Sequence, residues 1–402
     1  MSNIVIIGGG PSGMAAAIKA SENKNNKVTI IERQGRVGRK LLSTGNGRCN
    51  LTNTGAGLSN YHGDDVSFAA YALKVYSPYE ILRFFGDLGL IVTEEYGGRV
   101  YPMSNHAGSV LDVLRLKLDT QGVEIITGAV VSSVTKSKDK FNVKWDGGSI
   151  TADKVIVACG GCAGSKLGGV MDGYNILKGS GHSRTSLYPA LTQIRTEADF
   201  PKAMKGIKID GRLKILRNNR VLAENSGDIL FTETGISGTA AFEVSRTVST
   251  GGEGLFVSID FFENMTKEEL FAFIQNRKKS APLLPANQLF TGSVHNRAGQ
   301  MICKYVGISG GREASSVKKA EIAALCDAAK DFRLKITGVS GFESAQVTAG
   351  GIKTSEFDPK TMESKLVPGL FACGEVLDID GDCGGYNLQW AWASGLIAGG
   401  AL

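Results

Sequence analysis

The chain has 402 residues, 42% of them hydrophobic, and its 45 Lys and Arg residues exceed its 39 Asp and Glu residues to give a formal net charge of +6. This length exceeds what a single hydrophobic core serves, so we expect more than one domain. No apolar run reaches the ~18 residues of a membrane span. The small positive excess, without basic runs interleaved with aromatic residues, does not indicate a nucleic-acid partner.

The start of the chain, the cysteines and the histidines bear on the cellular compartment and on metal binding. The first predicted strand begins at Ile4, which leaves no room for a signal peptide, so we expect a cytoplasmic protein. Seven cysteines, an odd number scattered through a long chain, do not indicate a disulfide framework. The histidines are not spaced as metal ligands, so we expect no metal site. They are His62, His106, His182 and His295.

The most informative stretch is residues 8–13, where Gly-Gly-Gly-Pro-Ser-Gly follows an apolar strand and precedes a small-residue helix predicted at 14–18. A strand, a G-x-G-x-x-G turn and a helix in this order are typical of dinucleotide binding. Gly8 permits the tight turn, Gly10 lets a pyrophosphate approach the backbone, and Gly13 allows close packing of the helix on the strand. The N–H groups and the dipole at the helix start favour phosphate.

A second predicted strand, residues 27–31, ends in Glu32, nineteen positions beyond Gly13. At that spacing a carboxylate accepts hydrogen bonds from a ribose hydroxyl. A glycine-rich loop at 36–50 follows directly and carries four basic side chains, which suit phosphate and the edge of a flavin. The alternative interpretation is a surface glutamate followed by a generic loop. Because the strand, the glutamate and the basic loop follow one another, we favour binding of a cofactor.

A third strand, predicted at 154–158, runs into the turn Cys159-Gly160-Gly161-Cys162. Its two cysteines also have the spacing of a redox dithiol. Because they lie where a strand enters a glycine loop, we favour a structural role beside the cofactor over the redox role.

The C-terminal segment supplies the other half of the predicted site. An apolar strand leads into Gly374 and Glu375, and Gly384-Gly385-Tyr386-Asn387 then opens an apolar helix at 388–398. The N–H groups and the dipole of such a helix start stabilise negative charge on a reduced flavin. A core helix with a glycine turn is the alternative.

The pattern changes twice along the chain. Short β-like runs give way to helix-like segments and then return, after which the glycine-rich loop style of the N-terminal part resumes. We therefore expect an α/β fold in which a Rossmann-like FAD-binding domain carries an inserted cap. The expected domains are the discontinuous FAD-binding domain at 1–186 and 346–402, a β-rich insertion domain at 187–265 plus 332–345, and a helical insertion domain at 266–331.

Several motifs together resemble one known family. They are Gly8 to Gly13 with Glu32, the loop 38–50, Arg99 to Pro102, Gly227 to Gly238, Val347 to Gly351 and the run 373–395. They are similar to those of the YhiN/BaiN/aminoacetone-oxidase group of FAD flavoproteins, and the resemblance covers the whole chain. It implies a bound FAD, a three-domain build with a capping insertion, and oxidoreductase activity.

The resemblance also implies which residues hold the FAD. Glu32 would hold the adenosine ribose, the backbone of Val131 would meet the adenine, and Gly385 to Leu388 would lie at the pyrimidine end. The full predicted set is Gly8, Gly10, Pro11, Ser12, Gly13, Glu32, Arg33, Lys40, Leu41, Thr44, Gly45, Asn46, Val131, Cys159, Gly160, Gly161, Gly374, Glu375, Gly385, Tyr386, Asn387 and Leu388. Cys159, Cys162 and the pair Asp382-Cys383 depart from residues common in the family, which affects the expected polarity around the flavin rather than the fold.

Flavin supplies hydride transfer through its N5 atom, while the protein supplies orientation and electrostatics. No second dinucleotide-binding unit is present in the sequence, so NADH or NADPH would visit the flavin transiently. We favour NAD(P)H-driven reduction of an activated C=C bond in a small organic substrate. The main alternative is an aminoacetone-type amine oxidase that uses O2 and produces H2O2. An FAD-containing binding protein, an RNA-modifying flavoprotein and an NAD-binding dehydrogenase are further alternatives.

Three residues are candidates for contact with the substrate. Arg48, Arg99 and Tyr101 belong to motifs that should border the flavin. Phosphate contact and packing at a strand end are equally good interpretations of these residues. The sequence assigns no catalytic acid or base.

Overall fold

A parallel sheet forms the centre of the Rossmann-like part of the chain. In the computed structural model, which describes residues 1–402, its five strands run in the order β20 (Leu370–Ala372), β11 (Lys154–Val157), β1 (Ser2–Ile7), β2 (Asn26–Glu32) and β7 (Glu124–Thr127). Every neighbouring pair is parallel. The Val- and Ile-rich centres of β1 and β11 are buried, as expected for strands covered on both faces. The predicted α/β class is confirmed.

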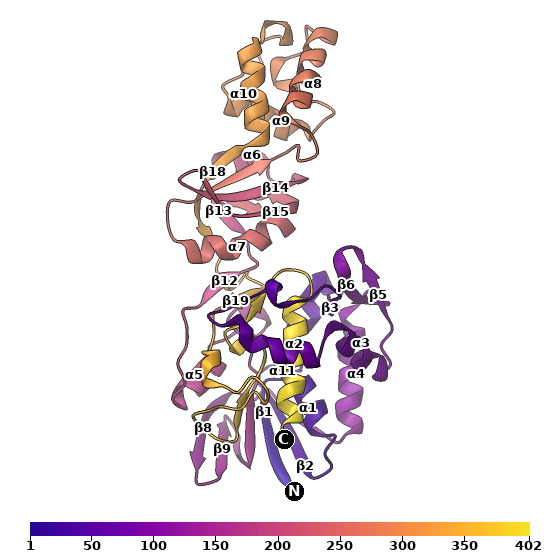
Figure 1. Cartoon of the computed structure of the whole chain (residues 1–402), viewed down its shortest axis with the longest axis vertical. Helices are drawn as coiled ribbons and strands as arrows, with labels where there is room; N and C mark the ends of the chain where they lie inside the picture. The colour runs from indigo at the N-terminus through magenta and orange to yellow at the C-terminus, as the bar shows by residue number, and fades with distance from the viewer. The chain divides into compact units, whose positions relative to one another are not determined.

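Two helices of this part pack with their backbones in close approach (Figure 1). They are α1 (Pro11–Ala20) and α11 (Tyr386–Gly400). A Cβ atom at Gly395 would lie 2.3 Å from the carbonyl oxygen of Ser12, and one at Gly399 would lie 2.3 Å from that of Ala16. Glycine is therefore required at both positions of α11, because any side chain there would push the two helices apart.

Smaller elements complete this unit. One antiparallel sheet contains β8 (Val131–Ser137), β9 (Lys140–Trp145) and β10 (Gly148–Ala152), and another contains β3 (Thr52–Asn53), β6 (Arg99–Pro102) and β5 (Val92–Glu95). A short pair joins β4 (Tyr61–His62) to β21 (Asp380–Gly381). The remaining longer helices are α2 (Ala69–Val75), α3 (Pro78–Asp87), α4 (Ala107–Thr120) and α5 (Asp172–Gly179).

The chain divides into two compact units, residues 1–188 with 346–402, and residues 189–345. The second unit contains a closed barrel in the order β13 (Ile194–Thr196), β16 (Gly235–Ser237), β15 (Arg220–Phe231), β14 (Lys208–Arg217), β17 (Phe256–Asp260) and β18 (Phe332–Val339). Helices α8 (Lys267–Ser280), α9 (Asn296–Tyr305) and α10 (Lys319–Lys330) lie between β17 and β18 in the chain, and α6 (Asp199–Ala203) and α7 (Thr239–Gly251) lie among the barrel strands.

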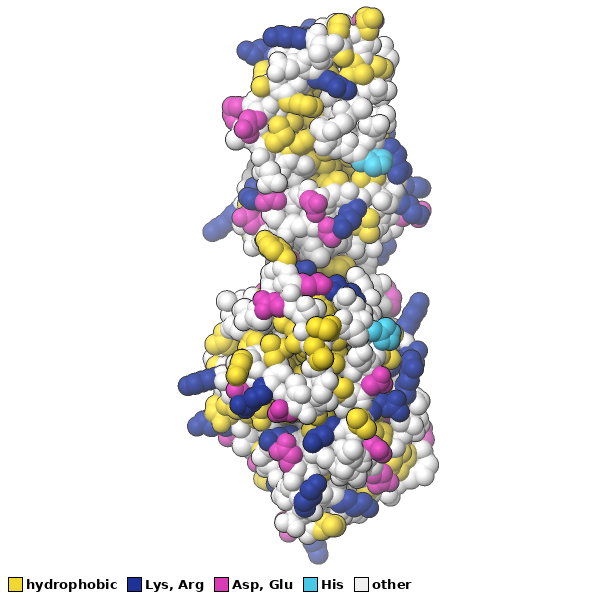
Figure 2. Space-filling view, turned by 90° about the vertical axis from the view of Figure 1, so that its right-hand side faces the viewer, with side chains coloured by type: hydrophobic (Ala, Val, Ile, Leu, Met, Phe, Trp, Pro, Cys, Tyr) yellow, Lys and Arg dark blue, Asp and Glu magenta, His cyan; other side chains and the backbone are white.

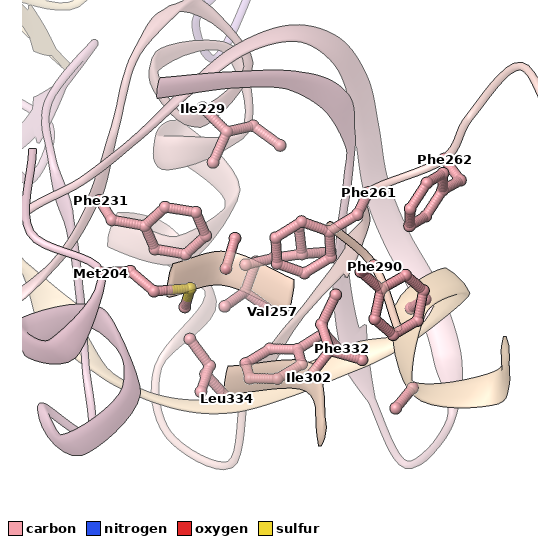
Figure 3. Packing of buried hydrophobic residues seen from close by; sticks show 14 of the residues in the cluster. Met204, Ile229, Phe231, Val257, Phe261, Phe262, Phe290, Ile302, Phe332 and Leu334 are labelled. Carbon is pink, nitrogen blue, oxygen red and sulfur yellow. The ribbon is translucent and has the colours of Figure 1, made fainter. Parts of the chain in front are cut away.

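Barrel and helices of the second unit share one hydrophobic cluster (Figure 3). The Phe261 ring stacks on Phe231 at 6.0 Å and meets Phe332 edge-on at 5.7 Å. Phe290 and Ile302 from the helical segment belong to the same cluster. The sequence pattern separates a β-rich from a helical domain here, and that division stays a prediction. None of the helices of the chain is long and apolar enough to cross a membrane.

A buried hydrogen-bond chain fastens three segments of the first unit. His182 Nδ1 lies 2.8 Å from a Glu356 carboxylate oxygen, and His182 Nε2 lies 2.9 Å from Ser364 Oγ. Ser364 Oγ also accepts the N–H groups of Leu366 and Val367. Burial lowers the pKa of His182, and the hydrogen bond to Glu356 only partly offsets that effect. The folded protein therefore prefers the neutral imidazole.

We expect this preference to make stability fall on mild acidification. In the unfolded chain a histidine takes up a proton near pH 6.5. Below that pH the unfolded state binds a proton that folded His182 resists, so the free energy of unfolding falls with pH until the folded state is protonated too. Thermal unfolding between about pH 7 and pH 5 should show a weaker pH dependence in His182→Gln than in the wild type. An unchanged slope in His182→Gln would show that another group causes the pH dependence.

Candidate functional site

Four predicted segments meet at one edge of the parallel sheet. The turn at 8–13 follows β1, Glu32 ends β2, Cys159 to Gly161 follow β11, and Gly374 and Glu375 follow β20. Because these strands are parallel neighbours, their carboxyl ends lie at the same edge. Ligands of open α/β sheets bind in the crevice outside these strand ends. The structure thus brings together segments more than 300 positions apart in the sequence.

The turn after β1 has the geometry of a phosphate site. Gly8 has φ +107°, and a Cβ there would lie 2.5 Å from the carbonyl oxygen of Ala158. A Cβ at Gly13 would lie 2.0 Å from the carbonyl oxygen of Gly8, whereas one at Gly10 would meet no atom within 4 Å. Helix α1 begins at Pro11 with no side-chain cap. Its first N–H groups are therefore free for a ligand in the open space beside Gly10.

Glu32 is only 8% exposed and fixes the turn in front of it. Its carboxylate accepts hydrogen bonds from the N–H groups of Gly9 and Gln34, both at 2.7 Å. The carbonyl oxygen of Glu32 accepts the N–H group of Ala129 at 3.0 Å, and Val131 begins β8 just beyond. The segments predicted for the ribose and the adenine are thus neighbours.

An ion pair joins the loop after β2 to the strand end of β20. Lys40 Nζ lies 2.9 Å from Glu375 Oε2, and Glu375 Oε1 accepts the N–H group of Thr348 at 2.8 Å. A Cβ at Gly161 would lie 2.5 Å from Thr348 Oγ1, so glycine is required where the loop after β11 passes the threonine. Another predicted residue, Arg33, pairs with Asp172 at 2.7 Å. Both predicted cations therefore have carboxylate partners within the protein.

The cysteines of the β11 turn have separate partners. Cys159 Sγ donates to the carbonyl oxygen of Ile7 at 3.4 Å, while Cys162 Sγ lies 3.0 Å from the sulfur of Met171. None of the seven cysteines forms a disulfide. Burial raises the pKa of both thiols, and only a thiolate is reactive. The environment therefore favours the structural role over the redox dithiol.

The loop after Lys40 turns sharply beneath Tyr101. Leu41 is buried, and Thr44 Oγ1 donates to its carbonyl oxygen at 2.7 Å. Gly45 and Asn46 both adopt left-handed conformations, with φ +56° and +57°. A Cβ at Gly45 would lie 3.3 Å from the Tyr101 ring and 2.8 Å from the backbone nitrogen of Asn50.

Helix α11 starts without a side-chain cap at Gly385, which has φ +103°. A Cβ there would lie 2.5 Å from the carbonyl oxygen of Thr52 and 2.9 Å from Asn50 Oδ1. Asn387 clamps the preceding turn, because its side chain accepts the N–H group of Gly381 and donates to the carbonyl oxygen of the same residue. The protein's own backbone thus supplies a reason for glycine at 385, in addition to the flavin contact that the sequence predicts.

The three candidate substrate residues lie close to this helix start. The Arg48 guanidinium lies 3.9 Å from the centroid of the Tyr101 ring, and it is held by Glu95 and by Asn105. Arg99 Nε would lie 3.6 Å from a Cβ at Gly384. Tyr386 and Leu388 occupy the first turn of α11, where the Tyr386 carbonyl oxygen accepts the hydroxyl of Tyr61 at 3.0 Å.

The residues at this edge fit an FAD. The open space beside Gly10 and the uncapped start of α1 suit a pyrophosphate, and the uncapped start of α11 suits the electron-rich end of a flavin. Asn50 Oδ1 is buried without a hydrogen-bond partner beside Gly385. A buried acceptor left unpaired is costly, so it points to a donor that a ligand supplies.

Sequence reasoning missed several residues that shape this site. Thr348 lies within a recognised motif, but its contact with the β11 loop had no signal of its own. Asn53 donates to the carbonyl oxygens of Gly97 and Gly384, and His62 pairs with Asp382 at 2.8 Å. These are contacts between distant loops, and no local pattern encodes them.

The whole chain matches one protein family. The profile of the HI0933-like protein Rossmann domain matches residues 2–401. The chain belongs to this family. It is 39% identical to a 3-dehydro-bile acid delta(4,6)-reductase of Clostridium scindens over 99% of this chain and 98% of that protein. It is 28% identical to a ribosomal RNA dihydrouridine synthase of Escherichia coli over 97% of this chain and 95% of that protein. A flavocytochrome c3 fumarate reductase in its open conformation shares 16% identity at a TM-score of 0.48, over 100% of this chain and 78% of that one.

This family membership confirms the resemblance drawn from the motifs. The protein is an FAD-dependent oxidoreductase with a Rossmann-like domain.

Proposed function

We propose that this enzyme uses NADH or NADPH to reduce a C=C bond conjugated to a carbonyl group in a small organic substrate. The observation that carries the proposal is the 39% identity, over nearly the full length of both chains, to an enzyme named as a 3-dehydro-bile acid delta(4,6)-reductase. That name describes a ring ketone whose neighbouring double bonds are reduced. The site geometry supports the same chemistry, because it offers the uncapped start of α11 beside two arginines and a tyrosine.

The more distant relatives support the reaction class rather than the substrate. Dihydrouridine is uridine in which the ring C=C bond next to a carbonyl has been saturated, so the name dihydrouridine synthase also describes reduction of a conjugated C=C bond. Two hydrogens are added across a carbonyl-activated double bond in both cases. The substrates differ greatly, so the reaction is the shared part of the proposal.

Each part of the site has a role in this reaction. The turn 8–13 and Glu32 bind the dinucleotide portion, and the start of α11 stabilises negative charge at the pyrimidine end. When bound, FAD supplies hydride transfer. Arg48 and Arg99 provide positive charge near the site, where the substrate carbonyl oxygen gains negative charge during reduction. NADH or NADPH visits only for the exchange, since the chain has no second dinucleotide unit.

The proposal is tested with the purified protein under anaerobic conditions. Mass analysis of the released ligand should give FAD, and NADH or NADPH should bleach the flavin absorbance. A steroid or other cyclic enone should then restore it, with one enone reduced per nicotinamide oxidised. Bleaching by aminoacetone, with recovery and H2O2 formation on adding O2, would instead establish the amine oxidase. Reduction by neither donor would leave a binding protein.

RNA is the second candidate substrate, and the ribosomal RNA dihydrouridine synthases are the observation that favours it. Against it, Asp and Glu side chains lie among the Lys and Arg side chains on the face in Figure 2. Dihydrouridine formation in ribosomal RNA, measured with the same reduced enzyme, decides between the two. Affinity for RNA that falls steeply with salt would support the RNA substrate.

A further inference from the structure

We propose that Tyr101 donates the proton that completes reduction of the C=C bond, and that Arg48 is the positioning residue that favours this transfer. The assignment rests on the proposed function. Tyr101 lies on β6 with only 8% of its surface exposed. The Arg48 guanidinium covers the face of its ring at 3.9 Å. Burial and neighbouring charges act on the hydroxyl, but no hydrogen bond of the protein engages it. The Tyr101 ring is therefore held in place, while its hydroxyl group can donate its proton to a substrate.

The placement of Tyr101 follows from three converging segments. Its ring lies 3.3 Å from the Cβ position of Gly45, in the loop that follows Lys40. Cys383, just before the start of α11, is close enough to act on its charge. The ring thus lies between the loop and the helix start that form the flavin end of the candidate site. A substrate held at this end of the candidate site would lie near Tyr101.

A second tyrosine near α11 does not qualify. Tyr61 already donates its hydroxyl proton to the carbonyl oxygen of Tyr386 at 3.0 Å. Of the two, Tyr101 alone combines a free hydroxyl with neighbouring positive charge.

The charges around Tyr101 suit a general acid. Burial raises the pKa of Tyr101 above its usual value, so the phenol is protonated at neutral pH. Arg99 and Arg48 act in the opposite direction and stabilise the phenolate left after transfer, while Glu95 and Cys383 oppose it. The two arginines therefore lower the cost of giving up the proton without removing it beforehand.

Every atom and electron of the proposed reduction is accounted for. NAD(P)H is oxidised by two electrons, and the hydride it provides forms a C–H bond at the carbon remote from the carbonyl. The C=C electron pair moves toward the carbonyl oxygen. The carbon next to the carbonyl then forms a C–H bond with the Tyr101 proton as the O–H bond breaks, and the phenolate takes a proton from water. The substrate gains two hydrogens in total.

The test compares Tyr101→Phe with Tyr96→Phe, which alters a tyrosine that is 100% exposed on the neighbouring turn. Both variants should retain FAD and be reduced by NADPH at the wild-type rate. Reoxidation of the reduced enzyme by an enone should be slower by about a hundredfold or more in Tyr101→Phe, as expected for loss of a general acid, and unchanged in Tyr96→Phe. A saturated ketone, which the enzyme cannot reduce, should perturb the flavin spectrum of both variants. The ketone concentration needed for this change should be the same as for the wild type.

A further readout tests whether Arg48 acts on the Tyr101 hydroxyl. Ultraviolet titration of the FAD-free protein should show one tyrosine that is missing in Tyr101→Phe, and Arg48→Met should move its titration to higher pH, because the cation over the ring stabilises the phenolate. A merely structural Arg48 would leave that titration unchanged.

Reoxidation of Tyr101→Phe by the enone at the wild-type rate would overturn the assignment while leaving the proposed function standing. A wild-type enzyme that no enone reoxidises would overturn both together.

Discussion

Gly13→Val is expected to destabilise the Rossmann-like unit by about 3 kcal/mol or more, whereas Gly10→Ala, three positions earlier, is expected to leave the FAD-free protein within about 1 kcal/mol of the wild type. The two glycines belong to one motif but have different surroundings. A Cβ at Gly13 would lie 2.0 Å from the carbonyl oxygen of Gly8, which is backbone and cannot turn aside. A Cβ at Gly10 would meet nothing within 4 Å.

The order of effects should reverse for cofactor binding by the folded protein. Gly10→Ala places a methyl group in the space proposed for the pyrophosphate, so FAD affinity should fall at least tenfold, about 1.4 kcal/mol. Chemical denaturation of the FAD-free proteins gives the stabilities, and flavin titration gives the affinities. If Gly10→Ala bound FAD as tightly as the wild type, the pyrophosphate would not lie beside Gly10. If it unfolded as easily as Gly13→Val, the space there would not be open.

Much of the fold follows from local pattern, which explains why it could be predicted. The apolar runs that became β1, β2 and β11 are continuous because both faces of a parallel sheet are buried. The Gly8 to Gly13 turn was predictable because strand, glycines and helix are adjacent in the chain. The start of α11 was predictable for the same reason.

The remaining features depend on contacts that a pattern does not contain. Lys40 meets Glu375 across 335 positions, and His182 meets Ser364 across 182. Nothing near these residues in the sequence specifies the partner. Gly395 and Gly399 lie within a helix, where glycine is unfavourable by itself. Only the close approach of α1 explains them.

In the candidate site, too, some features follow from local sequence pattern and others depend on contacts between distant residues. Its strand-end residues could be predicted, because parallel topology places the ends of β1, β2, β11 and β20 at one edge. The stacking of Arg48 on Tyr101 could not be predicted, since it requires the loop after Lys40 and strand β6 to be folded against each other. The sequence could therefore name Arg48 and Tyr101 as candidate substrate residues, but the contact between them emerges only from the three-dimensional arrangement.

Glu32→Ala is expected to weaken both the turn and the cofactor site. In the FAD-free protein the variant leaves the buried N–H group of Gly9 without its acceptor at 2.7 Å. Hydrogen bonds to a charged group contribute about 1.5–3 kcal/mol, so the free energy of unfolding should fall by a similar amount. FAD affinity should fall about tenfold to a hundredfold, because the same carboxylate is proposed to accept from the ribose.

Glu22→Ala is the matched control for Glu32→Ala. Glu22 lies just beyond α1, half-exposed, and pairs only with Lys19 on the surface, so its loss should change stability by less than about 1 kcal/mol and leave FAD binding unchanged. Glu32→Gln separates the two roles of Glu32 in part, since its amide oxygen accepts from one of the two backbone N–H groups while its amide nitrogen faces the other and the negative charge is gone. A smaller loss of stability than in Glu32→Ala, together with an equal loss of FAD affinity, would show that the carboxylate acts on the ribose directly. Equal FAD affinity in Glu32→Ala and the wild type would remove Glu32 from the cofactor site and leave it as the residue that fixes the turn.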